Sequence, residues 1–235
     1  MVLLRSVIYF IFLIPLTIFY VLLSLLISFL PFPIRYKIIS SWARINVWLL
    51  KVICGVNYQI RGQENIPAEA SIIMCNHQSA WETLTLQFIF PPQVWVLKRE
   101  LLWIPIFGWG LATLKPIAID RKSGREAVKQ VIEQGKQRLE NGIWVTIFPE
   151  GTRIAPGKTR RYGKSGGLLA EKTGALIVPV AHNAGLCWPR NSFVKKPGVI
   201  EMVIGPAIDP KGKDAEQITE EVRQWIDPMV KKLLE

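Results

Sequence analysis

Two short polar motifs combine residue types that carry out acid–base and phosphate chemistry. The first runs from Asn76 to Glu82 and contains His77, one of two histidines in the chain. A histidine can act as a general base near neutral pH, and a carboxylate on its other ring nitrogen would fix the tautomer and stabilise the imidazolium. Because no serine or cysteine nucleophile is apparent beside His77, the proton it takes would come from a substrate hydroxyl.

The same motif has a purely structural explanation. Residues 79–82 follow the S-x-x-E pattern of a capping box, in which Glu82 would only satisfy backbone N–H groups at the start of a helix. The two roles are compatible, because a carboxylate in the first helical turn lies where a preceding histidine can reach it. The residues alone leave both interpretations open.

The second motif, Phe148 to Arg153, is rich in groups that bind phosphate. Arg153 offers a bidentate fork, and a turn at Gly151 can add backbone N–H donors. A basic segment, 158–164, follows and is typical of a solvated loop. Five residues separate Gly151 from Gly157 where a P-loop requires four, so a P-loop is excluded. The motif indicates a phosphorylated substrate.

Several other residue groups support weaker expectations. The charged residues at 98–100 and 120–121 follow candidate strands and either join the site or pair with one another. His182 has no obvious partner and is expected to be structural. The aromatic stretch 101–109 is expected in the core, with a lipid-facing surface as the alternative. Cys54, Cys75 and Cys187 are odd in number and widely spaced, which favours reduced thiols over disulfides or zinc.

Composition and charge point to a membrane and to anionic partners. The 235 residues are 50% hydrophobic and 20% charged, a composition that excludes a disordered chain. The net charge of +11 favours anionic partners. From Val7 to Leu30 there are 24 uncharged residues, enough to cross a hydrocarbon core of about 30 Å. This stretch is too long for a signal peptide, and no cleavage site follows it.

A second N-terminal segment, 34–54, interleaves basic and apolar residues like an amphipathic helix at a membrane interface. Spanning the bilayer and lying in one leaflet both remain possible, since Pro15 would kink the first helix. Basic residues dominate the C-terminal flank of the apolar stretch, so the rest of the chain is expected to face the cytoplasm. We expect residues 1–55 to be a two-helix anchor and residues 56–235 to be one domain.

The elements that position the motifs alternate between strand and helix after Gly55. This order predicts an α/β fold, a layered sheet flanked by helices, with its chemistry at the carboxyl ends of strands. Strands are expected at 56–60, 71–75, 94–97, 116–119, 143–148, 176–180 and 199–204, and helices from about 79, at 123–141, at 167–172 and from about 215. Ser123 is the expected cap of the second of these helices, and Gly142 follows its end.

Together the motifs resemble the glycerolipid acyltransferases, and within them the bacterial 1-acyl-sn-glycerol-3-phosphate acyltransferases, over about residues 50–206. The family block Asn-His-x4-Asp matches Asn76, His77 and, with glutamate in place of aspartate, Glu82. The other three family blocks match Lys98 to Leu101 continuing to Arg121, Phe148 to Arg153, and Ile177 to Val180. Four blocks in order are far more specific than any one.

The resemblance implies an enzyme of phospholipid biosynthesis. His77 would take the proton from the sn-2 hydroxyl of lysophosphatidate, Glu82 would orient His77, and the hydroxyl would attack acyl-CoA or acyl carrier protein directly to make phosphatidic acid. The residues implied to bind the glycerol phosphate are Arg121, Glu150, Gly151, Thr152 and Arg153. The implied location is the bacterial inner membrane with the catalytic domain in the cytoplasm, in contact with membrane lipids and without a metal or cofactor.

Two alternatives remain at this stage. The acceptor is another lyso-lipid or glycerol 3-phosphate, or the protein is a noncatalytic lipid-binding protein in which His77 is structural. Nucleic acid is not an expected partner, because it explains the charge but not the anchor, and no nucleic-acid-binding motif is apparent.

Overall fold

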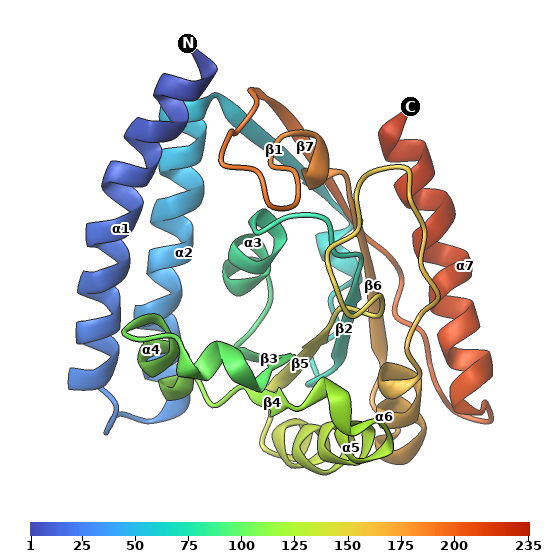
Figure 1. Ribbon diagram of the computed structural model, residues 1–235. Helices are drawn as coiled ribbons and strands as arrows, with labels where there is room; N and C mark the ends of the chain where they lie inside the picture. The colour runs from blue at the N-terminus through green and yellow to red at the C-terminus, as the bar shows by residue number, and fades with distance from the viewer.

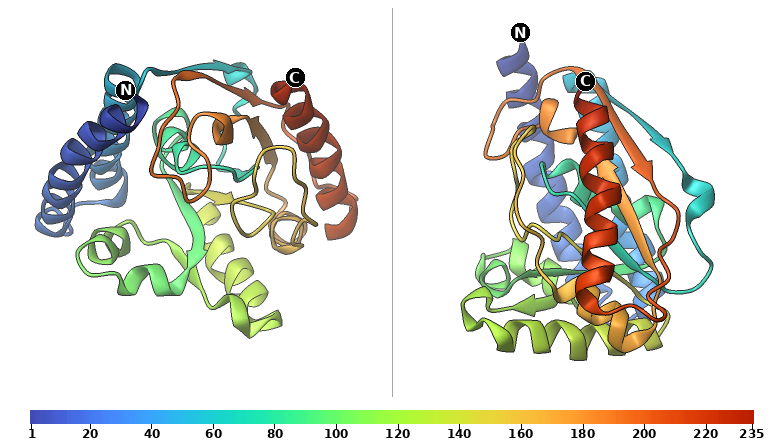
Figure 2. Two further views of the ribbon diagram at one scale, coloured as in Figure 1. Left: turned by 45° about the horizontal axis from the view of Figure 1, so that its top comes forward. Right: turned by 90° about the vertical axis from the view of Figure 1, so that its right-hand side faces the viewer.

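The fold is a central mixed sheet with helices on both faces and a helical pair along one flank (Figures 1 and 2). The computed structural model describes all 235 residues apart from the side chain of Arg121. The strands are β1 (Val56–Arg61), β2 (Ile72–Cys75), β3 (Gln93–Lys98), β4 (Ile117–Ile119), β5 (Trp144–Ile147), β6 (Ile177–His182) and β7 (Gly198–Ile204). The α-helices are α1 (Val2–Leu26), α2 (Phe32–Cys54), α3 (Trp81–Ile89), α4 (Phe107–Thr113), α5 (Arg125–Glu140), α6 (Ser165–Thr173) and α7 (Ala215–Leu234).

The strand order in the sheet is β1-β7-β6-β2-β5-β3-β4, with every neighbouring pair parallel except β6 and β7. In the register, Ile72 of β2 lies opposite both Val145 of β5 and Ile177 of β6. All residues of these three strands are buried, as expected of strands covered on both faces. The carboxyl ends of β2, β5 and β6 therefore meet at one edge of the sheet.

Two apolar layers hold the sheet. On one side, α5, α6 and α7 cover it through buried residues such as Val131, Leu169 and Val222. On the other, α2 and α3 cover it through residues such as Leu50 and Leu86. The predicted α/β fold is confirmed, and each predicted strand and helix corresponds to an element of the structure.

Two local expectations are wrong. Helix α5 begins at Arg125 with Gly124 as its N-cap residue, because residues 120–123 form a turn of their own in which the Ser123 hydroxyl donates to the Asp120 carbonyl. The aromatic stretch 101–109 is not in the core. It lies on the flank beside α1, and Trp103 and Trp109 are 66% and 55% exposed. The three cysteines are buried free thiols.

The expected two-helix apolar anchor is confirmed in part. Both helices form, but of the residues that the structure describes, α1 alone makes a helix long and apolar enough to cross a membrane. Helix α2 packs along α1, with hydrogen bonds from the Trp42 indole to Thr17 and between the hydroxyls of Tyr20 and Ser41. The two helices form a connected pair on the flank of the sheet (Figure 1).

Gly167 of α6 packs closely against Ala215 and Thr219 of α7 and gives a test of the packing. A Cβ atom there would lie 2.3 Å from the Ala215 carbonyl oxygen, so we expect Gly167→Ala to cost about 1–3 kcal/mol of unfolding free energy in spite of alanine's higher helix propensity. Chemical denaturation in detergent measures this, with Gly163→Ala as the matched control, because its Cβ would lie 3.5 Å from the nearest atom. Equal stabilities of the two variants would contradict the expectation.

Candidate active site

The contact between His77 and Glu82 is the centre of the site. His77 follows β2, Glu82 lies in the first turn of α3, and His77 Nδ1 is 2.7 Å from Glu82 Oε1. The same oxygen accepts hydrogen bonds from the backbone N–H groups of Gln78, at 3.1 Å, and Ser79, at 2.8 Å. The two interpretations of this motif thus hold together: one carboxylate oxygen receives backbone donors ahead of α3 and also holds the histidine.

Glu82 is completely buried and ionised. Burial by itself would raise the pKa of its carboxyl, but the neighbouring His182 and His77 rings and the Ser79 N–H lower the pKa below its ordinary value. A carboxylate can only accept, so the His77 ring donates from Nδ1 and keeps its free lone pair on Nε2. The His77 ring also stacks on Phe148 with a centroid separation of 4.0 Å. These contacts orient the His77 ring so that Nε2 can act as a base.

The second motif holds the backbone of His77 on both sides. The His77 N–H donates to Glu150 Oε1 at 3.2 Å, and the Ile154 N–H donates to the His77 carbonyl at 2.7 Å. Burial raises the pKa of Glu150 to about 8, so its carboxyl is largely protonated at pH 7. Glu150 lies behind His77, and its predicted contact with substrate stays a prediction.

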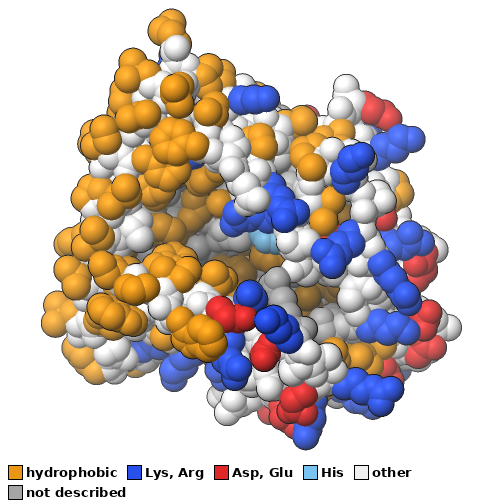
Figure 3. Space-filling view, in the orientation of Figure 1, with side chains coloured by type: hydrophobic (Ala, Val, Ile, Leu, Met, Phe, Trp, Pro, Cys, Tyr) orange, Lys and Arg blue, Asp and Glu red, His pale blue; other side chains and the backbone are white. Residues whose placement is uncertain are grey.

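The predicted phosphate-binding residues follow β5 beside this loop. Gly151 adopts a φ of +67°, which glycine tolerates, and its N–H closes a turn onto the Phe148 carbonyl at 3.0 Å. Thr152 and Arg153 are half-buried, and the Arg190 guanidinium donates to the Arg153 carbonyl at 2.8 Å. Figure 3 shows Lys and Arg side chains close to the histidine at the rim of a hollow, with hydrophobic side chains across it.

The charged residues at 98–100 and 120, which follow β3 and β4, form ion pairs with one another. Lys98 is 3.1 Å from Glu100, and Arg99 is 3.7 Å from Asp120. Arg121 follows β4 in a short 3-10 turn, but its side chain lies outside the described part of the structure, so its role also stays a prediction.

His182 is the residue that sequence reasoning missed. It is completely buried at the end of β6, its Nε2 is 2.8 Å from the Asn76 carbonyl and 3.7 Å from Glu82 Oε2. The sequence shows no partner for it, whereas the structure places it against Asn76 and Glu82, the residues next to the base. The sequence does show that His182 lies at the end of a strand. It does not show that this strand, β6, pairs with β2 and so brings His182 beside Glu82.

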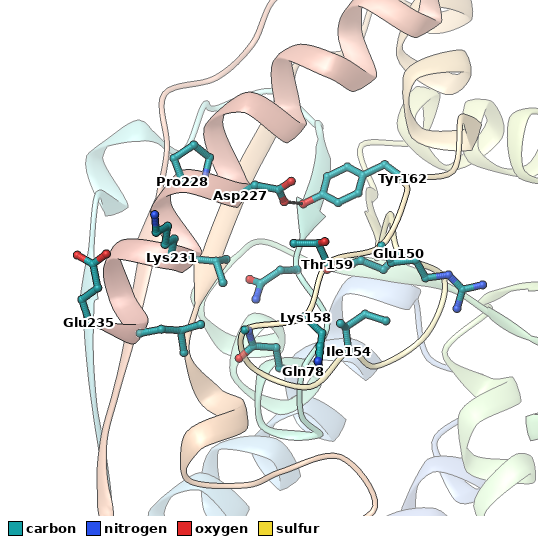
Figure 4. Close-up of a pocket in the computed structure, with 15 residues that line it drawn as sticks. Gln78, Glu150, Ile154, Lys158, Thr159, Tyr162, Asp227, Pro228, Lys231 and Glu235 are labelled. Atoms are coloured by element: carbon teal, nitrogen blue, oxygen red, sulfur yellow. Dashed lines mark hydrogen bonds between the residues drawn. The ribbon is translucent and has the colours of Figure 1, made fainter.

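A separate cavity of about 750 Å³ lies between the loop 154–162 and α7 (Figure 4). Its wall contains the Tyr162 hydroxyl, which donates to Asp227 at 2.9 Å, and its lining includes Asn76, Gln78 and Glu150 from the two motifs. The basic segment 158–164 contributes Lys158 and Arg160 to it. The segment 158–164 is exposed apart from Tyr162, as expected of a solvated loop, and it forms one wall of this cavity.

Comparisons with known proteins agree with this geometry. A family model described as Acyltransferase matches residues 57–183. The chain is 47% identical over 192 residues to a 1-acyl-sn-glycerol-3-phosphate acyltransferase of Pseudomonas aeruginosa, covering 81% of this chain and 75% of that one. A protein of the same name from Borreliella burgdorferi is 31% identical over 206 residues, with 85% and 79% covered.

The crystal structure of the 1-acyl-sn-glycerophosphate acyltransferase PlsC from Thermotoga maritima superposes with a TM-score of 0.82 at 27% identity, covering 99% of this chain and 95% of that one. The matched region contains both polar motifs and the strands that carry them. The chain is therefore an acyltransferase and belongs to the family that includes the 1-acyl-sn-glycerol-3-phosphate acyltransferases.

Proposed function

We propose that the protein transfers a fatty acyl group from an acyl thioester, acyl-CoA or acyl carrier protein, to the sn-2 hydroxyl of 1-acyl-glycerol 3-phosphate, making phosphatidic acid. The observation that carries the proposal is the 2.7 Å contact between His77 and a buried, ionised Glu82. Its setting supports a substrate that is both apolar and anionic, because the hollow beside the histidine has hydrophobic side chains on one side and cations on the other (Figure 3). The names of the similar proteins support the same acceptor.

In this reaction His77 Nε2 takes the proton of the sn-2 hydroxyl as the oxygen attacks the thioester carbonyl carbon. The Glu82 carboxylate stabilises the resulting imidazolium through Nδ1. The tetrahedral intermediate then expels the thiolate. The thiolate takes from His77 the proton that came from the hydroxyl, so the base returns to its neutral form. The ester bond forms and the thioester bond breaks without a covalent acyl-enzyme.

The phosphate of the acceptor would bind at the turn after β5. Arg153 and Arg121 would supply charge, Thr152 would supply a hydroxyl, and Gly151 would shape the turn that carries them. Glu150 contributes by holding the His77 N–H, in addition to its predicted place in the substrate site. A net charge of +11 also suits either anionic acyl donor.

The packing of α1 indicates how the enzyme sits on a membrane. Near its N-terminus, Tyr9 and Phe10 contact Trp188 and Phe193 of the catalytic part, at ring-centroid distances of 5.9 and 4.6 Å. Near its other end, Val21 packs against Gly110 of α4. At 1.5 Å per residue, these contacts are about 18 Å apart along the helix axis. If α1 crossed the bilayer, the parts of the catalytic domain that contact it near each end would also have to lie inside the bilayer.

We therefore propose that α1 lies in one leaflet with the catalytic part at the cytoplasmic surface of a bacterial inner membrane. Residues 1–55 form the anchoring part and residues 56–235 the catalytic part. The exposed Trp103 and Trp109 beside α1 suit the lipid interface. Both the acceptor and the product are amphiphiles, so this arrangement keeps the active site at the surface where they reside.

The role of the histidine and carboxylate is tested by acyl transfer to lysophosphatidate in membranes, with acyl-CoA and acyl carrier protein as separate donors. We expect His77→Ala to lower kcat by about 10²–10⁴-fold, because the base is lost. Glu82→Gln keeps an oxygen that accepts from the backbone N–H groups but loses the negative charge. A fall in kcat on the order of 10²-fold in this variant would show that Glu82 acts in catalysis and does not only cap α3. Full activity of His77→Ala would exclude the mechanism.

Glu150 gives a prediction about pH. Its pKa rises on folding from 4.5 to about 8, so the folded state binds the extra proton between these values and the wild-type unfolding free energy falls as pH rises through this window. Glu150→Gln stays neutral and can still accept from the His77 N–H, so its unfolding free energy should depend less on pH. Urea unfolding at pH 5 and pH 8 measures the difference, and parallel pH dependences of the two proteins would contradict it.

The placement of α1 is tested with single cysteines at two exposed positions, Leu3→Cys near its start and Ser28→Cys in the turn just after its end, in cells and in sealed inverted vesicles. Because α1 is proposed to lie in one leaflet, a membrane-impermeant maleimide should reach both sites from the cytoplasmic side. The wild type controls for background, since its own thiols are buried. Labelling of the two sites from opposite sides would show that α1 spans the bilayer.

A further inference from the structure

The two oxygens of Glu82 have very different surroundings. Oε1 receives the His77 ring and two backbone N–H groups. Oε2 is buried and has no hydrogen-bond partner among the described residues. A buried carboxylate oxygen without a donor is costly, and the polar atom facing it is His182 Nε2, at 3.7 Å. The second histidine of the chain therefore lies against the free oxygen of the carboxylate that holds the first.

The hydrogen bonds of His182 fix where its proton lies. The Ala184 N–H donates to His182 Nδ1 at 3.1 Å, so Nδ1 carries the lone pair and Nε2 carries the proton. That proton is donated to the Asn76 carbonyl at 2.8 Å. Burial lowers the pKa of His182, against the opposing effect of Glu82, and keeps the ring neutral. The Nε2–H group that the Asn76 carbonyl holds is thus also the polar group beside Glu82 Oε2, with 3.7 Å between the nitrogen and that oxygen.

His182 is also held rigidly to the residue before the base. The Asn76 side chain accepts from the His182 N–H at 2.9 Å and donates to the His182 carbonyl at 3.0 Å. With the ring contact, three hydrogen bonds join these two residues across β2 and β6. Any displacement of the His182 ring therefore changes the position of the dipole relative to Glu82 and of the chain that leads into His77.

We propose that His182 is a positioning residue for acyl transfer, whose Nε2–H dipole, anchored on the Asn76 carbonyl, lies beside Oε2 of Glu82 and keeps Oε1 facing His77. This inference rests on the proposed function. At 3.7 Å the contact is too long for a hydrogen bond, but a dipole beside a buried charge acts strongly where water is excluded.

The contact makes a prediction about the base. The titratable groups around Glu82 are His77 and His182, with Glu150 and Cys75 also in its electrostatic environment. The His182 dipole offsets part of the Glu82 charge, which weakens the stabilisation of the His77 imidazolium. Removing the dipole should strengthen the stabilisation of the His77 imidazolium and move the acid limb of the activity profile to higher pH, because His77 must be neutral to act.

Two matched substitutions separate this role from simple packing. In His182→Gln an amide N–H can occupy the place of Nε2, whereas in His182→Asn the shorter amide can meet only the Ala184 N–H. We expect the asparagine variant to lose on the order of tenfold in kcat with little change in KM and a raised acid limb, and the glutamine variant to stay within about threefold of wild type. Wild-type kcat in the asparagine variant, or a loss with an unshifted acid limb, would overturn the proposal.

A second measurement needs no variant, since the chain has only two histidines. In wild-type protein labelled with ¹⁵N-histidine, the His182 ring should stay neutral with its proton on Nε2 across the pH range in which the enzyme is active. A His182 ring that becomes charged in this range, or that carries its proton on Nδ1, would refute the proposal. This spectrum tests the premise of the proposal even where the asparagine variant does not fold. Absence of phosphatidic acid with both donors would instead refute the proposed function.

Discussion

A buried negative charge at Glu82 is the constraint on which the site depends. A carboxylate without water is tolerated only when donors surround it, and here the donors are a histidine ring and two backbone N–H groups on one oxygen. These donors come from residues 77–79, so the chain must turn sharply between β2 and α3. The requirement to satisfy the charge therefore also fixes the backbone that carries the base.

The order of the strands supplies the other supports. Because β2 lies between β5 and β6, the end of β5 brings Phe148 under the histidine ring and the end of β6 brings His182 behind the carboxylate. Glu150, from the same loop as Phe148, then fixes the histidine backbone. The parallel neighbours of β2 thus direct the segments after β5 and at the end of β6 towards the His77–Glu82 pair.

How much of this is visible in the sequence depends on how local each interaction is. His77 and Glu82 lie five residues apart, so their contact follows from spacing, and the strands follow from continuous apolar runs. The partners Glu150 and His182 are 73 and 105 positions from His77, and only the strand order, which one sequence does not specify, brings them together. Ser123 and Trp103 were misjudged because a competing turn and a flanking helix, not the residues' own preferences, decide their surroundings.

The packing of α1 against the rest of the chain links the membrane-facing surface to the site of the chemistry. Helix α1 contacts the catalytic part at both ends, so the apolar flank and the cationic loops belong to one continuous surface with the histidine between them (Figure 3). An amphiphile lying at a membrane interface has its acyl chain on the apolar side and its phosphate on the aqueous side, in the same order. In the proposed reaction the hydroxyl lies between these two parts of the acceptor, so anchoring the enzyme along α1 would itself orient that hydroxyl towards His77.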